Sequence, residues 1–216
     1  MQLGLCYSGG KDSTLAAFLL DRFYDVTLVT AHFGITDDWR RAETTAEALE
    51  FPFETIELDR SVAVDAVDRM LEDGYPRNGI QQVHEHALEA VATMDLPATD
   101  GGTGGGADTD PATDGFDAIA DGTRRDDRVP SISRATAQSL EDRHGVDYVA
   151  PLTGFGRGAV DRLVEATFEV EVGPSDEIQR ADYEAELRAL LADRAGSDAV
   201  DEVFPDHEQT AVVGRR

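Results

Sequence analysis

The chain has one cysteine and no long apolar run. Cys6 stands alone among 216 residues, which excludes an intramolecular disulfide and a cysteine-rich metal site. Its place in a short apolar run, residues 3–7, indicates a small buried side chain rather than a nucleophile. No apolar run approaches the roughly 18 residues of a membrane span, and no signal peptide precedes the first motif. We therefore expect a soluble, cytoplasmic protein without a membrane partner.

Basic residues are also scarce, and nearly all of them are arginine. The chain has 19 basic against 44 acidic residues and a net charge of −25, and Lys11 is its single lysine. An acidic surface normally argues against nucleic-acid binding, because phosphates are attracted to a basic face. Acid excess with little lysine is also typical of halophilic proteins. At molar salt the Debye length falls to about 3 Å, so that net charge says little about partners. The alternative is an acidic protein from a cell with an ordinary salt concentration.

Apolar runs alternate with segments of helical periodicity, which is typical of an α/β protein. The strand candidates are 3–7, 26–33, 53–58, 116–121 and 146–150. The helix candidates are 12–23, 37–49, 60–72, 78–94, 133–144, 158–166 and 175–194. This order predicts a doubly wound, mostly parallel five-stranded Rossmann-like sheet over residues 1–172. Residues 173–216 are expected to form a C-terminal helical extension and tail, in which 209–214 fit an edge strand. Residues 168–172 fit either a strand or an extended arm.

Residues 96–115 interrupt the pattern. The segment LPATDGGTGGGADTDPATDG has almost nothing to bury, so it cannot offset the entropy cost of ordering. We expect a disordered surface insertion there. A glycine-rich phosphate loop is the alternative, but no strand leads into the segment and no helix signal follows it closely.

The sequence YSGGKDS at residues 7–13 joins the first strand candidate to the first helix candidate. A strand, a glycine turn and a helix N-terminus together form an anion site, because backbone N–H groups converge there and the helix dipole favours negative charge. The expected phosphate ligands are Tyr7, Ser8, Gly9, Gly10, Lys11, Asp12 and Ser13. Three further segments follow predicted strands: Ala31, His32 and Phe33; Gly122 and Thr123; Pro151 and Leu152. Because the carboxyl ends of parallel strands meet at one edge of a sheet, the four segments predict one ligand site.

The SGGKDS sequence resembles the loop of the N-type ATP pyrophosphatases, or PP-loop proteins, which are also called adenine-nucleotide alpha-hydrolase-like proteins. It is distinct from a Walker A loop. Residues 31–33 resemble the strand end at which that family holds adenine and ribose. Residues 121–127 resemble its GT-x-x-DD segment. Residues 149–152 resemble the end of its strand before the substrate-facing region. The resemblance covers about residues 1–165 and implies an ATP-binding domain with the HUP-type fold. Small archaeal PP-loop proteins assigned to tRNA thiouridine modification are the most similar members.

The resemblance also implies a reaction. ATP binds with Mg²⁺, an acceptor oxygen attacks the α-phosphate, and pyrophosphate leaves behind an adenylated intermediate from which a nitrogen or sulfur nucleophile displaces AMP. The implied catalytic residues are Lys11, Asp12 and Asp127, and the implied metal ligands are Asp12, Asp126 and Asp127. Gly122 and Thr123 are implied to face the nucleotide. Which of Arg124, Arg125 and Arg128 contacts the α-phosphate or the acceptor is left open.

Each of these residues also has a structural interpretation. Asp12 suits the N-cap of the first helix, and Asp126 and Asp127 suit an acidic surface balanced by neighbouring arginines. His32 on an apolar strand is more often packed than catalytic. The histidines at 84 and 86 lie two residues apart, so a helix would point them in different directions, which does not favour a metal site.

The sequence does not determine the acceptor. Thiolation of a tRNA base is the leading hypothesis, and with Cys6 as the lone cysteine the sulfur would come from a separate sulfur-carrier protein or from free sulfide. An ATP-dependent amidoligase that uses ammonia and an adenine-nucleotide sensor without turnover are the alternatives. The oligomeric state also stays open, with a homodimer as one option.

Overall fold

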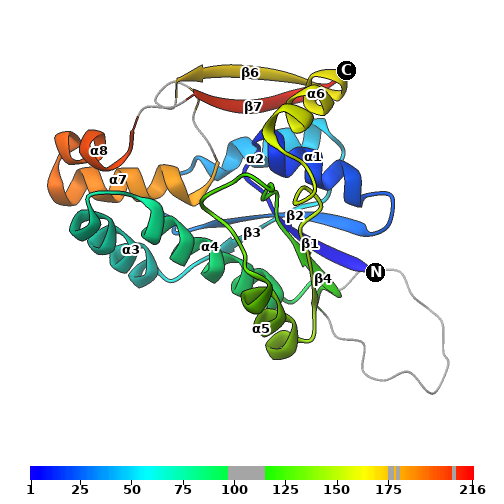
Figure 1. The fold of residues 1–216 in the computed structure, drawn as a ribbon, viewed down its shortest axis with the longest axis horizontal. Coiled ribbons are helices and arrows are strands. Elements are labelled where there is room, and N and C mark those ends of the chain that lie inside the picture. Colours follow the sequence, from blue (N-terminus) through cyan, green and yellow to red (C-terminus); the bar gives the residue numbers. More distant parts are fainter. Residues whose placement is uncertain (97–114, 175–177, 179–180, 206–207) are drawn as a thin grey trace.

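A computed structural model describes residues 1–96, 115–174, 178, 181–205 and 208–216 of the chain (Figure 1). Within these residues the chain forms a five-stranded sheet with helices on both faces and a separate two-stranded ribbon. The insertion expected at 96–115 falls almost wholly outside the described residues, and Asp95 and Gly115 pair with each other on its two sides. None of the helices described is both long and apolar enough to cross a membrane.

The central sheet confirms the predicted doubly wound α/β fold. Its strands are β1 (Gln2–Cys6), β2 (Asp25–His32), β3 (Phe53–Glu57), β4 (Ala118–Ala120) and β5 (Asp147–Val149). They lie in the order β3-β2-β1-β4-β5, and every neighbouring pair is parallel. The strand order reverses between β1 and β4. In sheets of this kind, ligands bind outside the carboxyl ends of the strands at such a switch point.

Alternate residues of the strands face two layers of helices. The helices of one face are α1 (Lys11–Leu20), α2 (Trp39–Ala48) and α6 (Arg157–Thr167), and those of the other are α3 (Arg60–Asp73), α4 (Arg77–Ala92) and α5 (Arg134–His144). Leu3 and Leu5 of β1 pack in the first layer, whereas Val29 and Ile119 pack in the second. Burial on both faces explains why these strands are nearly continuous apolar runs.

The C-terminal part of the chain folds back over the sheet edge that carries the SGGKDS loop. Strand β6 (Phe168–Pro174) pairs antiparallel with β7 (Glu208–Arg215), and α7 (Tyr183–Ala195) and α8 (Ser197–Val203) lie between them in the sequence. The ribbon of β6 and β7 packs against α1, α2 and α6, whereas α7 packs against α3 (Figure 1). The extension therefore combines two helices with a strand, and the boundary expected between residues 172 and 173 lies inside β6.

Some helix ends differ from the sequence pattern. Helix α1 begins at Lys11 with Gly10 as its N-cap, so the expected caps, Asp12 and Ser13, lie inside its first turn. It ends at Leu20, and Phe23, which the periodicity placed on its buried side, is 76% exposed. The helix expected at 175–194 corresponds to α7, whose N-cap side chain comes later than expected, at residue 182. Helix α8 was not predicted.

Candidate functional site

The SGGKDS loop turns from β1 into α1 at the carboxyl edge of the sheet. Gly9 has a φ angle of 69°, in the left-handed region that favours glycine. The hydroxyl groups of Ser8 and Ser13 lie 3.3 Å apart, and Thr14 Oγ1 donates to the carbonyl of Gly10 at 2.8 Å. These side chains hold the turn in place, and the first residues of α1 line a cavity beside it.

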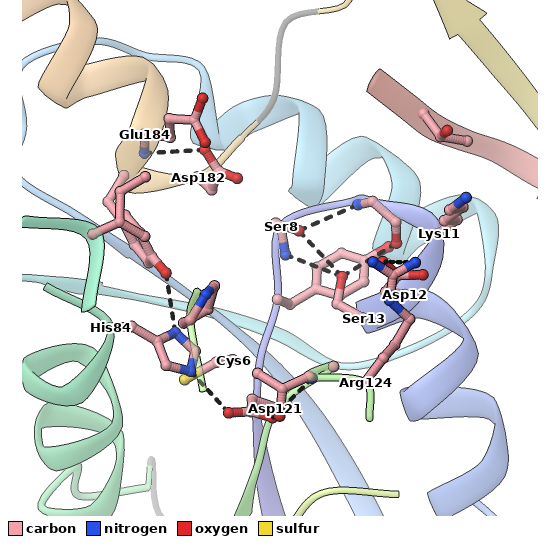
Figure 2. A pocket seen from close by; sticks show the side chains of 18 of the residues that line it. Cys6, Ser8, Lys11, Asp12, Ser13, His84, Asp121, Arg124, Asp182 and Glu184 are labelled. Atoms are coloured by element: carbon pink, nitrogen blue, oxygen red, sulfur yellow. Dashed lines mark hydrogen bonds and ion pairs between the residues drawn. The ribbon is translucent and has the colours of Figure 1, made fainter. Parts of the chain in front are cut away.

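The cavity has a volume of about 600 Å³ and lies at the switch point between β1 and β4 (Figure 2). The residues expected from the sequence that line it are Tyr7, Ser8, Gly10, Lys11, Asp12, Ser13, Ala31, Gly122 and Thr123. Three of the four predicted segments therefore meet at one cavity. Pro151 and Leu152 are not among its lining residues, and Leu152 is fully buried in the core.

The chain that leaves β4 runs so close to α1 that position 122 admits only glycine. A Cβ atom on Gly122 would lie 2.7 Å from the backbone nitrogen of Ser13 and 2.9 Å from the carbonyl carbon of Asp12. The next residue, Thr123, donates both its backbone N–H and its hydroxyl to Asp121 Oδ1, at 2.9 and 2.7 Å. The segment thus fixes the end of β4 against the loop.

Two cations lie on the loop side of the cavity. Lys11 Nζ lies 2.5 Å from Asp161 Oδ1 on α6. The guanidinium of Arg124 lies 2.5 Å from Asp127 Oδ1 and 3.6 Å from Asp12 Oδ2 (Figure 2). Burial acts to lower the pKa of Arg124, but the neighbouring carboxylates outweigh that effect and raise it. Arg124 therefore keeps its charge, although its side chain is only 12% exposed.

The two aspartates expected to share a metal hold Arg124 and the start of α6. Asp127 Oδ2 accepts the backbone N–H of Arg124 at 2.8 Å, while its Oδ1 accepts the guanidinium. Asp126 Oδ2 accepts the backbone N–H of Arg157 at 3.0 Å, and this bond is the main cause that lowers the pKa of Asp126. Neither aspartate is among the residues that line the cavity.

Asp12 is the expected metal ligand that does line the cavity. Mg²⁺ is usually held by one or two carboxylates together with phosphate oxygens and water. A single carboxylate beside the loop fits an ion that arrives with a nucleotide. In the described part of the chain, no group of three or more His, Cys, Asp or Glu side chains is arranged to hold a metal by itself.

The end of β2 contributes one of its three expected residues to the cavity. Ala31 lines it, whereas Phe33 is buried in the core formed with α3 and α7. His32 stacks on Trp39, with 5.8 Å between the ring centroids, and its Nδ1 accepts the backbone N–H of Gly34 at 3.1 Å. His32 is thus a packed histidine, which agrees with the structural interpretation given in the sequence analysis.

The C-terminal extension closes the cavity, which the sequence pattern did not reveal. The backbone N–H of Val212 donates to the carbonyl of Gly9 at 3.1 Å, and Gly10 pairs with Ala211, so β7 lies directly on the loop. The lining residues from the extension and β6 are Val170, Val172, Asp182, Tyr183, Glu184, Glu208 and Thr210. Asp182 and Glu184 lie across the cavity from the loop (Figure 2).

Glu186 docks α7 on the end of β2. Its side chain is only 2% exposed, and its carboxylate accepts the backbone N–H groups of Phe33, Ile35 and Thr36 at 2.6, 2.8 and 3.3 Å. Several donors are what a buried carboxylate needs, because an unpaired buried charge is very costly. No pattern in the sequence distinguishes this residue, since it is one of 44 acidic residues.

A buried network of polar side chains forms the floor of the cavity. Asp121 Oδ2 lies 2.8 Å from His84 Nε2 and accepts the hydroxyl of Tyr148 at 2.9 Å, while His84 Nδ1 lies 3.0 Å from the hydroxyl of Tyr183. Burial acts to raise the pKa of Asp121, but the hydrogen bonds from His84 and Thr123 outweigh it, so that the pKa is lowered. His84, Tyr148 and Tyr183 come from α4, β5 and α7, and Asp121 directly follows β4. No local sequence pattern links the four residues.

Cys6 lies on the same floor, where it lines the cavity (Figure 2). Burial, and next the charge of Asp121, raise the pKa of its thiol. A thiol that stays protonated is a poor nucleophile and a poor metal ligand. The expectation that Cys6 is not a nucleophile therefore has a physical basis, although the side chain borders the cavity.

Known proteins match this chain over nearly its whole length. An uncharacterised protein from Methanocaldococcus jannaschii is 38% identical over 215 residues, which cover 99% of this chain and 96% of the relative. A crystal structure described as a predicted subunit of tRNA methyltransferase from the same species has 37% sequence identity and a TM-score of 0.82, and the match covers 100% of this chain and 98% of that one. Residues 1–214 match the family of unknown function DUF7411, and the chain belongs to that family.

Proposed function

We propose that this protein binds ATP with Mg²⁺ and cleaves it between the α- and β-phosphates, so that AMP is transferred to an acceptor and pyrophosphate is released. The observation that carries the proposal is the SGGKDS loop, which lines a cavity of about 600 Å³ together with Arg124. This volume lies within the range of about 300–1,000 Å³ that is usual for small-molecule sites.

The charged residues of the loop side suit the departing pyrophosphate. Lys11, Arg124 and the N-terminus of α1 stabilise negative charge that develops on the leaving group. Asp12 would hold Mg²⁺, which when bound neutralises further phosphate charge. Hydrogen bonds within the turn keep these groups aligned before the nucleotide arrives, which lowers the entropy cost of reaching the transition state.

The apolar part of the lining suits an adenine ring. Val29 and Ala31 of β2 and Ile80 and Ala87 of α4 line it with apolar side chains. An apolar slot beside a charged phosphate site matches the two halves of a nucleotide.

For the acceptor we propose a tRNA base that is thiolated with sulfur from a separate carrier protein or from free sulfide. The similar M. jannaschii structure is described as a predicted tRNA methyltransferase subunit, which supports a tRNA-related substrate. Two exposed arginines lie where an RNA backbone would approach: Arg157 lines the cavity, and Arg125 lies against Gly156 next to it. Arginine is a common partner of RNA phosphates.

An ATP-dependent amidoligase that uses ammonia, similar to diphthine–ammonia ligase or asparagine synthase, is the second candidate. The protonated Cys6 thiol favours it, because this chain then carries no sulfur donor of its own. The carboxylates of Asp182, Glu184 and Glu208 line the cavity and would attract an ammonium ion. An adenine-nucleotide sensor without turnover is the third candidate.

Release of pyrophosphate from ATP and Mg²⁺ in molar KCl separates these candidates. Release that depends on added bulk tRNA supports tRNA modification, and release that depends on a small carboxylic acid with ammonia supports the ligase. ATP binding without release in any mixture supports the sensor. A failure to bind ATP in titration calorimetry would contradict all three.

A further inference from the structure

Three side chains on the cavity floor form a continuous chain of hydrogen bonds. Asp121 Oδ2 lies 2.8 Å from His84 Nε2, and His84 Nδ1 lies 3.0 Å from the hydroxyl oxygen of Tyr183. His84 is 5% exposed and Asp121 is 1% exposed, so water does not screen the contact between them. Both ring nitrogens of His84 have a partner, and the chain of bonds ends at Tyr183, which lines the cavity.

The partners of Asp121 determine which ring nitrogen of His84 carries the proton. Asp121 accepts two bonds from Thr123 and one from Tyr148, and its pKa is lowered despite burial, so it is ionised. An ionised carboxylate can only accept, so His84 Nε2 carries the hydrogen that lies between them. His84 Nδ1 then has a lone pair and accepts the hydroxyl hydrogen of Tyr183.

This direction of the bonds leaves the Tyr183 oxygen able to accept a hydrogen from the cavity. Burial raises the pKa of Tyr183, so the phenol stays protonated and donates to His84. The Tyr183 oxygen can still accept one hydrogen bond on the side away from His84. Tyr183 is the first residue of α7, and its neighbours Asp182 and Glu184 also line the cavity. A ligand N–H, O–H or S–H group placed there would extend the chain by one bond.

We propose that Asp121, His84 and Tyr183 are a proton relay for the acceptor, which rests on the adenylation proposed above. As the carbonyl oxygen of the acceptor base forms its bond to the α-phosphorus, the proton of the neighbouring ring N–H moves to the Tyr183 oxygen, and the Tyr183 proton moves to His84 Nδ1. The bond from the α-phosphorus to the bridging oxygen breaks, and pyrophosphate leaves with the electron pair. The imidazolium of His84 is paired with Asp121, and its extra proton returns through Tyr183 when the products leave.

The roles within the relay differ. Tyr183 is the catalytic residue, because its oxygen touches the reacting group, whereas His84 and Asp121 are positioning residues. The ionisable groups around His84 and Tyr183 are Cys6 of β1, Asp121 directly after β4, Tyr148 of β5, Asp182 at the N-cap of α7, and Glu184 of α7.

A purely structural link between α4 and α7 is the rival explanation, and the protonated nitrogen of His84 distinguishes the two. Heteronuclear NMR of protein with ¹⁵N-labelled histidine should find the His84 hydrogen on Nε2. In Asp121→Asn the side-chain amide can donate to Nε2, and the hydrogen should move to Nδ1. A wild-type hydrogen on Nδ1 would overturn the relay, because His84 would then donate to Tyr183 and could not accept its proton.

Activity supplies the second readout. A general base contributes roughly 100-fold or more to a rate, so Tyr183→Phe and Asp121→Asn should each lower pyrophosphate release by about 100-fold. ATP affinity in calorimetry should stay unchanged in both variants, and Tyr24→Phe, which removes a hydroxyl outside the cavity, is the matched control.

Two outcomes separate this proposal from the proposed function. An unchanged rate in Tyr183→Phe, or an equal loss in Tyr24→Phe, would overturn the relay while adenylation stands. A wild type that binds ATP and releases no pyrophosphate in any mixture would contradict adenylation, and the relay that serves it would fall as well.

Discussion

Lys11 at the start of α1 and Asp161 on α6 form an ion pair beside the SGGKDS loop, with 2.5 Å between Lys11 Nζ and Asp161 Oδ1. The pair joins a residue of the phosphate loop to a helix that begins 146 residues later. In the proposed complex with ATP, the lysine would exchange this carboxylate for phosphate oxygens. We therefore expect the ion pair to compete with the nucleotide.

Substitutions at the two ends of this pair should have opposite effects. Lys11→Met should weaken ATP binding by about tenfold, or about 1.4 kcal/mol, because a phosphate contact is lost. Asp161→Asn should leave the affinity equal or higher, because it releases Lys11. Titration calorimetry in molar KCl measures both, with the exposed Arg22→Met as the control. If Asp161→Asn weakens binding as much as Lys11→Met does, the pair organises the site rather than competing with the ligand.

Asp12→Ala should abolish pyrophosphate release while the fold survives. The side chain lines the cavity, lies 3.6 Å from Arg124, and is the proposed Mg²⁺ ligand. Circular dichroism should be unchanged, and no concentration of Mg²⁺ should restore the rate. Asp37→Ala, which removes an exposed aspartate, serves as the control. Wild-type turnover in Asp12→Ala would remove the metal role.

Gly122→Ala should destabilise the protein by about 1–3 kcal/mol, the usual cost of an overpacked atom. The added methyl group would meet backbone atoms of Ser13 and Asp12, which cannot move aside as a flexible side chain would. Gly154→Ala is the matched control, because nothing lies within 4 Å of its added atom. Denaturant unfolding measures both variants, and equal stability of the two would show that α1 shifts without cost.

Glu186→Gln should destabilise the protein by about 1.5–3 kcal/mol, the usual worth of hydrogen bonds to a charged group. The carboxylate accepts from three backbone N–H groups with its two oxygens. In glutamine an NH₂ group replaces one of these oxygens, and because NH₂ is itself a donor it cannot accept from the backbone. Glu202→Gln, on the exposed side of α8, is the control and should change little. A similar small effect at both positions would mean that α7 docks through its apolar side chains alone.

Asp121 should make stability sensitive to acid. Its pKa is lower in the folded protein than its ordinary value of about 3.9, so its ionised form stabilises the fold above that pH. This stabilisation is lost as the pH falls from about 4 through the lower, folded value. The free energy of unfolding of the wild type should thus fall on acidification, and so should the difference in this free energy between the wild type and Asp121→Asn. A difference that stays constant down to the acid transition would contradict this account.

The fold could be predicted because local patterns report it directly. Strands covered on both faces are nearly continuous apolar runs, and each is followed by a helix with its own periodicity. All five strands of the central sheet lie where such runs predicted them. The start of α1 was placed one residue or more too late, because Asp12 and Ser13 suit a cap but Gly10 occupies that position.

The site could be predicted only on the side that local sequence encodes. Gly10 and the small polar residues of the loop follow from what a phosphate turn requires, and they line the cavity. The opposite side depends on contacts between distant residues: His84 meets Asp121 over 37 positions and Tyr183 over 99. Because these contacts are made by the tertiary fold, no spacing in the sequence marks them.

The hydrogen bond from Val212 to Gly9 joins residues that are made at very different times. A ribosome synthesises the SGGKDS loop first and strand β7 only after the whole central sheet. Until β7 pairs with β6 and settles on the loop, the cavity has no wall on that side. A nascent chain therefore carries the complete SGGKDS motif without an enclosed site, and only chains whose synthesis has passed β7 can enclose the proposed nucleotide.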